Sequence, residues 1–529
     1  MSGMIEMRND LLAQLGRKIP KHTRTCLLSG LLIGWITHFY MLSHKLPNWD
    51  DGNNMNNFGS GDYLGRWFLK YIHPLGGSGS IPAVHGFWLI VCIAISACLI
   101  LEILQIRSIT GAVLTAAVLE TFPSVVSTMT FMFMAHTSGI GILMVVLAVY
   151  LLRKYRFGWL PCTVFLICVL GIYQSYISFA ITLMLLGMIS DIFHGKKFPE
   201  ILKRGIVCIL VLGIGVLVYM KLSHVIYPNL DNETYGGVGN MGQIAVSEMP
   251  TLIGRCYKRF LEYFLWKPFA FVSRPAQMAN IITCILAVVL FIYLAVTRKM
   301  YQDVLTFLML IVLCGFVPLA AAFIYFMAPE VSYSMLMLYA YALIYVTVLG
   351  LLEYCMEDWQ DKPVSVGWRN GLRYAVVIVT VCTIFVSSYT DYLLTNRAYL
   401  RTNLAAERVQ QYFNRVIARV ENTEGYESGD RIEILGEFNY RDNPSTVEVD
   451  ILNSEDLREL DGVALENGLI TTGVRDNFIK MFVGYDMADL SFSEKEDIME
   501  TEEYRKMTVY PKEGCVQKIN DIWVVKMCE

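Results

Sequence analysis

The sequence predicts a polytopic α-helical membrane protein of about eleven transmembrane helices, followed by a small extracytoplasmic C-terminal α/β domain. Three observations lead to this fold class. Of the 529 residues, 55% are hydrophobic and 17% are charged, and the mean hydropathy of +0.46 lies outside the soluble range. Long apolar runs recur over residues 1–395, where bases outnumber acids by 27 to 20. Residues 396–529 are instead acidic, with 27 acids and 16 bases.

The transmembrane helices are predicted from apolar runs of about 18 or more residues. These runs lie near 25–42, 84–104, 109–128, 131–152, 158–175, 177–193, 205–224, 279–297, 303–327, 332–352 and 374–394. The first run follows a polar, basic segment and has no small-residue cleavage site, so we expect it to be a retained span rather than a signal peptide.

The orientation follows from the basic residues beside the spans, because Lys and Arg concentrate in cytoplasmic loops. The clusters are Arg8, Arg17, Lys18, Lys21 and Arg24; Arg153-Lys154-Tyr155-Arg156; Lys196-Lys197 with Lys203-Arg204; Arg298-Lys299; and Arg369 with Arg373. They place residues 1–24 in the cytoplasm and make 25–395 the transmembrane domain. The loops 43–83 and 225–278 and the tail 396–529 then face the exterior. No basic run is long enough to indicate a nucleic-acid partner.

The tail begins with a predicted amphipathic helix over Asn396–Val420. Strands are expected at Arg431–Phe438, Ser445–Leu452 and Asp521–Met527, while Asp476–Val483 is ambiguous. Cys515 and Cys528 flank the last strand segment, and a hairpin there would place them opposite each other. An exported tail permits a disulfide between them, and two free thiols fit the sequence equally well.

The first outer loop contains the clearest candidate for chemistry. Asp50 and Asp51 follow the first span closely, so we expect them near the membrane surface. An acidic pair suits a general base that deprotonates a sugar hydroxyl, with the second carboxylate binding hydroxyls or a divalent metal. Further along this loop, Asp62, Arg66 and Trp67 follow, and Arg66 offers donors to a phosphate while Trp49 and Trp67 offer faces to a sugar ring. The alternative is structural: the segment Asp50-Asp51-Gly52-Asn53-Asn54 suits a tight turn, and Asp62 suits the cap of a helix over Tyr63–Tyr71.

The second outer loop contains a predicted interfacial helix over Ile253–Trp266, with aromatic side chains on one side and Arg255, Lys258 and Arg259 on the other. These cations are candidates for binding a lipid phosphate as it leaves. The alternative is that they contact the head groups of membrane lipids. Glu120 and His136, near outer span ends, are candidates for lining the mouth of the site.

Several of these motifs together resemble the bacterial type II glucosyltransferase family, which consists of polytopic enzymes of the GT-C type. The resemblance covers roughly residues 20–395. Its motifs are Trp49-Asp50-Asp51, Gly65-Arg66-Trp67, Phe122-Pro123 and Gly171-Ile172-Tyr173-Gln174-Ser175. It implies that Asp50 and Asp51 are the catalytic acid pair, with Asp62, Gly65, Arg66 and Trp67 in the same site. Glu330 and His136 match no family position, which leaves the acceptor side of the site open.

The resemblance also implies a polyprenyl-phosphate-linked glucose as donor, used outside the bacterial cell (inner) membrane, and an O-antigen or another surface glycan as acceptor. We therefore expect an inverting membrane glycosyltransferase with an Asp general base. The sequence has no Gly-rich phosphate loop, and no cofactor is certain beyond a possible divalent metal at Asp50 and Asp51. The alternative is a lipid-linked sugar flippase or polysaccharide transporter, which would place ionisable residues at mid-membrane in two related halves.

Overall fold

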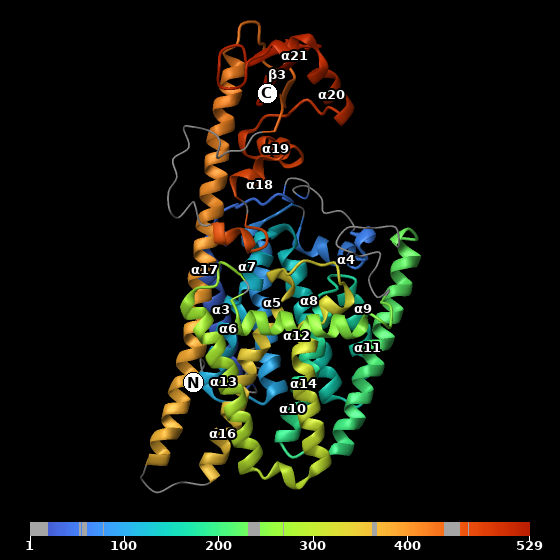
Figure 1. Cartoon of the computed structure of the whole chain (residues 1–529), viewed down its shortest axis with the longest axis vertical. Helices are drawn as coiled ribbons and strands as arrows, with labels where there is room; N and C mark the ends of the chain where they lie inside the picture. Colours follow the sequence, from blue (N-terminus) through green and yellow to red (C-terminus); the bar gives the residue numbers. More distant parts are fainter. Residues whose placement is uncertain are drawn as a thin grey trace, which may run out of the picture.

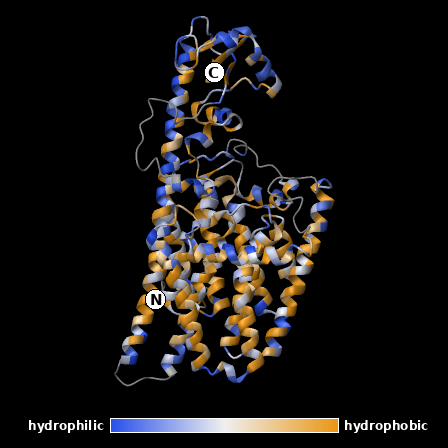
Figure 2. Cartoon of the chain, viewed as in Figure 1, coloured by the Kyte–Doolittle hydropathy of each residue, from blue (hydrophilic) through white to orange (hydrophobic). Residues whose placement is uncertain are grey.

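The computed structural model describes residues 19–51, 54, 61–77, 79–230, 244–267, 269–361, 368–437, 455–463 and 465–528. It is a bundle of long apolar helices with the tail standing at one end (Figure 1). Colouring by hydropathy separates the two parts, because the bundle is largely hydrophobic and the tail is mixed (Figure 2). The prediction of a polytopic helical membrane protein is confirmed. The predicted strand Ser445–Leu452 and the basic residues Arg8, Arg17 and Lys18 lie outside the described residues.

The bundle consists mainly of long helices joined by short turns at the end away from the tail. They are α3 (Lys21–Ser43), α5 (Pro82–Leu104), α6 (Ile109–Thr121), α7 (Pro123–Thr130), α8 (Ala135–Lys154), α9 (Trp159–Leu170), α10 (Tyr176–Phe193), α11 (Phe198–Ile226), α13 (Arg274–Thr297), α14 (Val304–Ala321), α16 (Ala342–Asp361) and α17 (Trp368–Glu421). The helices α4 (Leu69–Ile72) and α12 (Met249–Leu265) lie near the tail-side end (Figure 1), and the single-turn helix α15 (Ile324–Met327) follows α14.

The number of spans agrees with the prediction except at two segments. Within the described residues, nine helices are long and apolar enough to cross a membrane. The run predicted at 109–128 is broken into α6 and α7, which meet at an angle of 41° where Pro123 starts the second helix. The run predicted at 158–175 gives the shorter helix α9, because the chain leaves the helix at Gly171.

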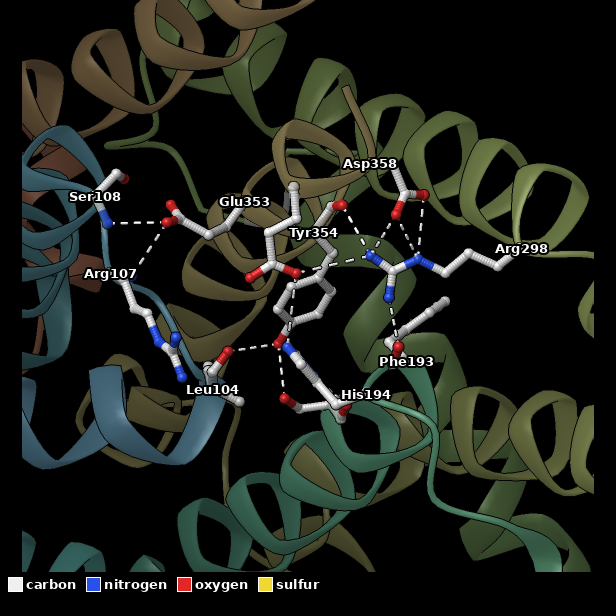
Figure 3. A network of polar contacts seen from close by, with 11 residues as sticks. Leu104, Arg107, Ser108, Phe193, His194, Arg298, Glu353, Tyr354 and Asp358 are labelled. Carbon is white, nitrogen blue, oxygen red and sulfur yellow. Dashed lines mark hydrogen bonds and ion pairs between the residues drawn. The ribbon is translucent and has the colours of Figure 1, made fainter. Parts of the chain in front are cut away.

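The end of the bundle opposite the tail is held by a network of polar contacts (Figure 3). Arg298 binds Asp358 with two nitrogens and donates to the carbonyl oxygens of Tyr354 and Phe193. Glu353 accepts hydrogen bonds from the backbone N–H groups of Arg107 and Ser108 at 3.2 and 2.9 Å. These contacts join α6, α10, α13 and α16 at their ends.

The helix α17 continues without a break from the bundle into the tail, across the boundary expected at residue 395. Its 54 residues correspond to about 80 Å of helix. As the amphipathic pattern predicted, Phe413, Val416 and Ile417 are buried, and they pack against the sheet of the tail.

The sheet of the tail has the order β1-β3-β2, from β1 (Ile432–Leu435), β2 (Val516–Ile519) and β3 (Ile522–Lys526). β1 pairs with β3 in parallel, and β2 and β3 form an antiparallel hairpin. Helices surround it: α18 (Glu466–Ile470), α19 (Thr472–Phe478), α20 (Phe492–Glu500) and α21 (Glu502–Lys506). The ambiguous segment Asp476–Val483 is helical, since α19 runs on into a π-helical turn over Ile479–Val483.

Of the two alternatives for Cys515 and Cys528, the hairpin register favours free thiols over a disulfide. Val516 faces Val525, and the backbone N–H of Lys526 donates to the carbonyl of Cys515 at 3.0 Å. Cys515 is therefore opposite Lys526, and Cys528 lies beyond the paired residues. Both cysteines are free thiols. The prediction placed the turn correctly but put the two cysteines opposite each other without knowing the register.

Candidate active site

The acidic turn after the first span is anchored to the end of α7. The side-chain amide of Asn48 is buried and donates to the carbonyl oxygen of Thr130 at 2.9 Å. The other end of the same side chain accepts the backbone N–H of Asp50 at 2.9 Å. One asparagine therefore fixes both the position of the turn and the direction in which Asp50 leaves it.

Asp51 is fully buried, and both of its carboxylate oxygens are engaged. Oδ1 lies 2.6 Å from Nζ of Lys45 and accepts from the hydroxyl of Ser80 at 3.2 Å. Oδ2 accepts the backbone N–H of Asn48 at 2.8 Å. Lys45 occupies the place beside Asp51 that a second cation would need, so the arrangement does not fit a divalent metal shared by Asp50 and Asp51. Among the described residues no group of three or more His, Cys, Asp or Glu could hold a metal ion.

Asp50 differs from its neighbour in every one of these respects. It is half-buried, and within the part of the chain that the structure describes its carboxylate has no hydrogen bond or ion pair. Burial raises the pKa of Asp50, the negative charge of Asp51 raises it further, and the positive charge of Arg66 opposes both effects. A carboxylate with a raised pKa and free oxygens is suited to accept a proton.

The turn that carries Gly65, Arg66 and Trp67 packs into the break between α9 and α10. The amide of Gln174 donates to the carbonyl oxygen of Leu64 at 2.7 Å, and the N–H of Phe68 donates to the carbonyl of Gly171 at 2.8 Å. A Cβ atom at Gly171 would lie 2.9 Å from the Trp67 ring. Two motifs about a hundred residues apart in the sequence thus form one unit.

Arg66 is held over the ring of Tyr173, with its guanidinium carbon 4.8 Å from the ring centre. Its buried Nε has no hydrogen-bond partner among the described residues. Asp62 starts the short 3-10 helix Asp62–Leu64 just before it. Arg66 is also near enough for its charge to act on Asp50, so the structure brings the acidic turn and the Gly-Arg-Trp turn together.

The two tryptophans have different environments. Trp67 is buried among Leu170, Ile177 and Tyr219, so the prediction of a sugar-stacking face there is wrong: its ring anchors the turn instead. Trp49 is 37% exposed and contacts the edge of Phe131, with ring centres 5.8 Å apart. Only Trp49 of the pair has a face available to a ligand.

Glu120 and His136 do not line an open mouth, because both are buried. Glu120 lies against α3, where a Cβ atom at Gly34 would come within 2.6 Å of its carboxylate. The Nε2–H of His136 donates to the carbonyl oxygen of His73 at 3.0 Å, and the centre of its ring is 4.2 Å from that of His85. Glu120 lies at the end of α6 and His136 at the start of α8, and both side chains are buried in the interior of the bundle.

The helix predicted at Ile253–Trp266 is present as α12, which lies across the bundle at its tail-side end (Figure 1). Arg255 donates to the carbonyl oxygen of Pro329 at 2.5 Å. Arg259 contacts Glu262 at 3.1 Å and stacks on Tyr333 at 4.7 Å. The side chain of Lys258 is 71% exposed, and its contact with Glu262 is long, at 3.8 Å. Lys258 is therefore the most accessible of the three cations.

One residue beside the site that the sequence did not indicate is Asp461, which docks the tail on the bundle. Its Oδ2 accepts the N–H of Leu336 at 2.8 Å and the hydroxyl of Ser334 at 2.9 Å, and burial raises its pKa. Its carbonyl oxygen accepts the hydroxyl of Thr130 at 3.1 Å. Because Thr130 also binds Asn48, the tail is docked directly beside the acidic turn.

The comparisons with known proteins agree with this arrangement. The family model described as Glucosyl transferase GtrII matches residues 39–351. The chain belongs to this family. The match to the GtrII family contains the acidic turn, the Gly-Arg-Trp turn, the α9–α10 break and α12. It ends within α16, so α17 and the tail lie outside it. No curated protein and no solved structure gives a significant match to the chain.

Proposed function

We propose that this GtrII protein transfers glucose from a polyprenyl-phosphate carrier to a hydroxyl group of a cell-surface glycan, on the tail side of a bacterial cell membrane. Residues 25–395 form the catalytic transmembrane domain in this proposal, with the N-terminus in the cytoplasm and the tail outside. The observation that carries it is the contrast between Asp50, which has no ion pair or hydrogen bond among the described residues, and the saturated Asp51 beside it.

In the proposed reaction Asp50 is the general base. The acceptor hydroxyl loses its proton to Asp50 as its oxygen attacks the anomeric carbon of glucose. The bond from that carbon to the phosphate oxygen breaks, and the lipid phosphate leaves with the electron pair. A single displacement of this kind inverts the anomeric centre. Asp51, held by Lys45, keeps the turn in place and maintains the raised proton affinity of its neighbour.

The remaining groups have supporting roles. The charge of Arg66 acts on Asp50, and its Nε, which has no partner among the described residues, is a donor available to the departing phosphate, where negative charge develops. Arg255, Lys258 and Arg259 on α12 lie where an interfacial helix meets lipid head groups, and Lys258 is the most exposed of them. Trp49 offers a ring face to a sugar.

The test is transfer of radiolabelled glucose from polyprenyl-phosphate-glucose to a surface-glycan extract, using membranes that hold equal amounts of folded protein. We expect Asp50→Asn to lower the rate by about 10²- to 10⁴-fold with unchanged thermal unfolding, since loss of a general base has that effect. Asp51→Asn should lower both transfer and thermal stability, because it breaks the contact with Lys45.

The matched control is Asp521→Asn, an exposed aspartate in the hairpin turn of the tail, which should transfer at the wild-type rate. A wild-type rate in Asp50→Asn would remove Asp50 as the base. If the wild-type protein moves the labelled lipid across vesicle membranes and yields no labelled glycan, the flippase alternative replaces the proposal.

A further inference from the structure

A charged cavity lies at the end of the bundle opposite the tail, far along the helices from the acidic turn. It has a volume of about 380 Å³ and is lined by residues of α8, α9, α10 and α11 and of the turn between α8 and α9. Four of its lining side chains are cations: Arg153, Arg156, Lys203 and Arg204. A second hollow of about 230 Å³ shares Arg153 and Arg204 with it.

The acids near the cavity neutralise only part of this charge. Asp191 is nearly buried and binds Arg153 with both oxygens, at 2.9 and 3.0 Å, while it also contacts Arg204. Glu200 lines the cavity, but it is paired with Lys196 at 2.8 Å. Within the part of the chain that the structure describes, Arg156 and Lys203 have no acidic partner. The cavity is therefore positively charged.

The guanidinium of Arg153 is positioned by the neighbouring helix α10. A Cβ atom at Gly187 would lie 2.5 Å from Nη1 of Arg153, so the guanidinium rests directly on the backbone of α10. Gly187 is one helical turn before Asp191, which receives the guanidinium. An arginine has five N–H donors, and the contact with Asp191 uses two of those of Arg153. Donors remain for an anion.

Apolar side chains form much of the rest of the lining, and an exposed apolar face of α11 adjoins the cavity. Leu152, Met184, Met188 and Val207 line it. Beside it, α11 presents the exposed side chains of Ile206, Ile209 and Leu210. A free inorganic anion would make no favourable contact with the apolar wall. A lipid has a charged head group for the basic side chains and a hydrocarbon chain for the apolar wall.

We infer that this cavity binds the phosphate head group of an anionic membrane lipid, with Arg156 and Lys203 as its free cations and the first carbons of the lipid chain against the apolar wall. Basic pockets between helices on the cytoplasmic side are suited to such lipids. This site is separate from the acidic turn, and it does not depend on the proposed sugar transfer.

The experiment uses the purified full-length protein in nanodiscs, with phosphatidylglycerol and phosphatidylcholine of the same chain length, and measures retained lipid by native mass spectrometry. The wild-type protein should retain phosphatidylglycerol in preference to phosphatidylcholine. The double variant Arg156→Gln/Lys203→Gln should bind phosphatidylglycerol roughly 30-fold more weakly, because each basic side chain near a phosphate contributes about a fivefold gain. Both side chains are exposed, so the variant should fold.

The matched control is Lys299→Gln/Arg369→Gln, which removes two exposed cations at the same end of the bundle outside the cavity. It should leave the retention of phosphatidylglycerol unchanged. An equal loss in the control would show general attraction to a basic surface and overturn the site. Displacement of the lipid by millimolar inorganic phosphate would also overturn it, because the cavity would then be a site for the free anion.

Discussion

The two ends of the helix bundle differ in whether their charged groups are paired within the protein. At the end away from the tail, Arg298 and Asp358 are joined to each other and Arg298 to backbone carbonyls, and Glu353 receives two backbone N–H groups (Figure 3). At the tail end, Asp50 and Nε of Arg66 have no such partners among the described residues. A buried polar group without a partner costs stability, so its presence points to a use other than folding.

The comparison also separates two kinds of basic residue at the far end. Arg298 is surrounded by acceptors and joins helices, while Arg156 and Lys203 lie at the rim of a cavity without acidic partners in the described residues. The first is part of the fold, and the others are available to a lipid. Pairing within the protein, rather than charge or position, distinguishes the two roles.

The largest expected effect on stability comes from Arg298→Met. Removing the guanidinium leaves Asp358 and the carbonyl oxygens of Tyr354 and Phe193 without their partner. We expect unfolding to become easier by about 3 kcal/mol, measured by thermal or denaturant unfolding in detergent, because this is the usual cost of breaking a largely buried ion pair. Transfer per folded molecule should not change. The neighbouring exposed cation gives the control Lys299→Met, and an equal loss there would contradict the assignment.

A smaller effect is expected from Gly171→Ala, which tests the contact between the two motifs at the tail end. The new methyl group would lie 2.9 Å from the Trp67 ring and push the turn that carries Arg66. We expect a loss of about 1–3 kcal/mol in stability and a roughly tenfold lower transfer rate. Gly213→Ala in α11 is the control, since no atom lies within 4 Å of its added carbon. Unchanged transfer in Gly171→Ala would separate the turn from the active site.

The smallest expected effect is a shift in pH dependence in Arg66→Gln. Asp50 acts as a base only when ionised, so transfer falls as the pH drops through its pKa, which burial and Asp51 raise. Arg66 favours the ionised form, and its removal raises the pKa of Asp50 further. The acidic limb of kcat/KM should therefore move to higher pH. Lys70→Gln, an exposed cation four residues along, should leave the limb in place; an equal shift in both variants would argue against a specific effect of Arg66.

Some parts of the fold and site were predictable because they depend on short stretches of sequence. The hydrophobic runs predicted the spans. The spacing of apolar residues around Phe413 predicted the part of α17 that packs on the sheet. The break at Pro123 was not predicted, since a run of apolar residues is compatible with a straight helix until its packing is known. Asp476–Val483 was ambiguous for a similar reason: its pattern is too short to choose between strand and helix.

The sequence by itself determined that the chain is a membrane protein, where its helices lie, and that Asp50, Asp51, Arg66 and Trp67 belong to one region. Only the tertiary structure decided the surroundings of each side chain. Asp51 is paired because Lys45 and Ser80 reach it, and Trp67 is buried because Gly171 leaves room for its ring. Proton affinity and accessibility depend on neighbours brought together by folding, and those neighbours are distant in the sequence.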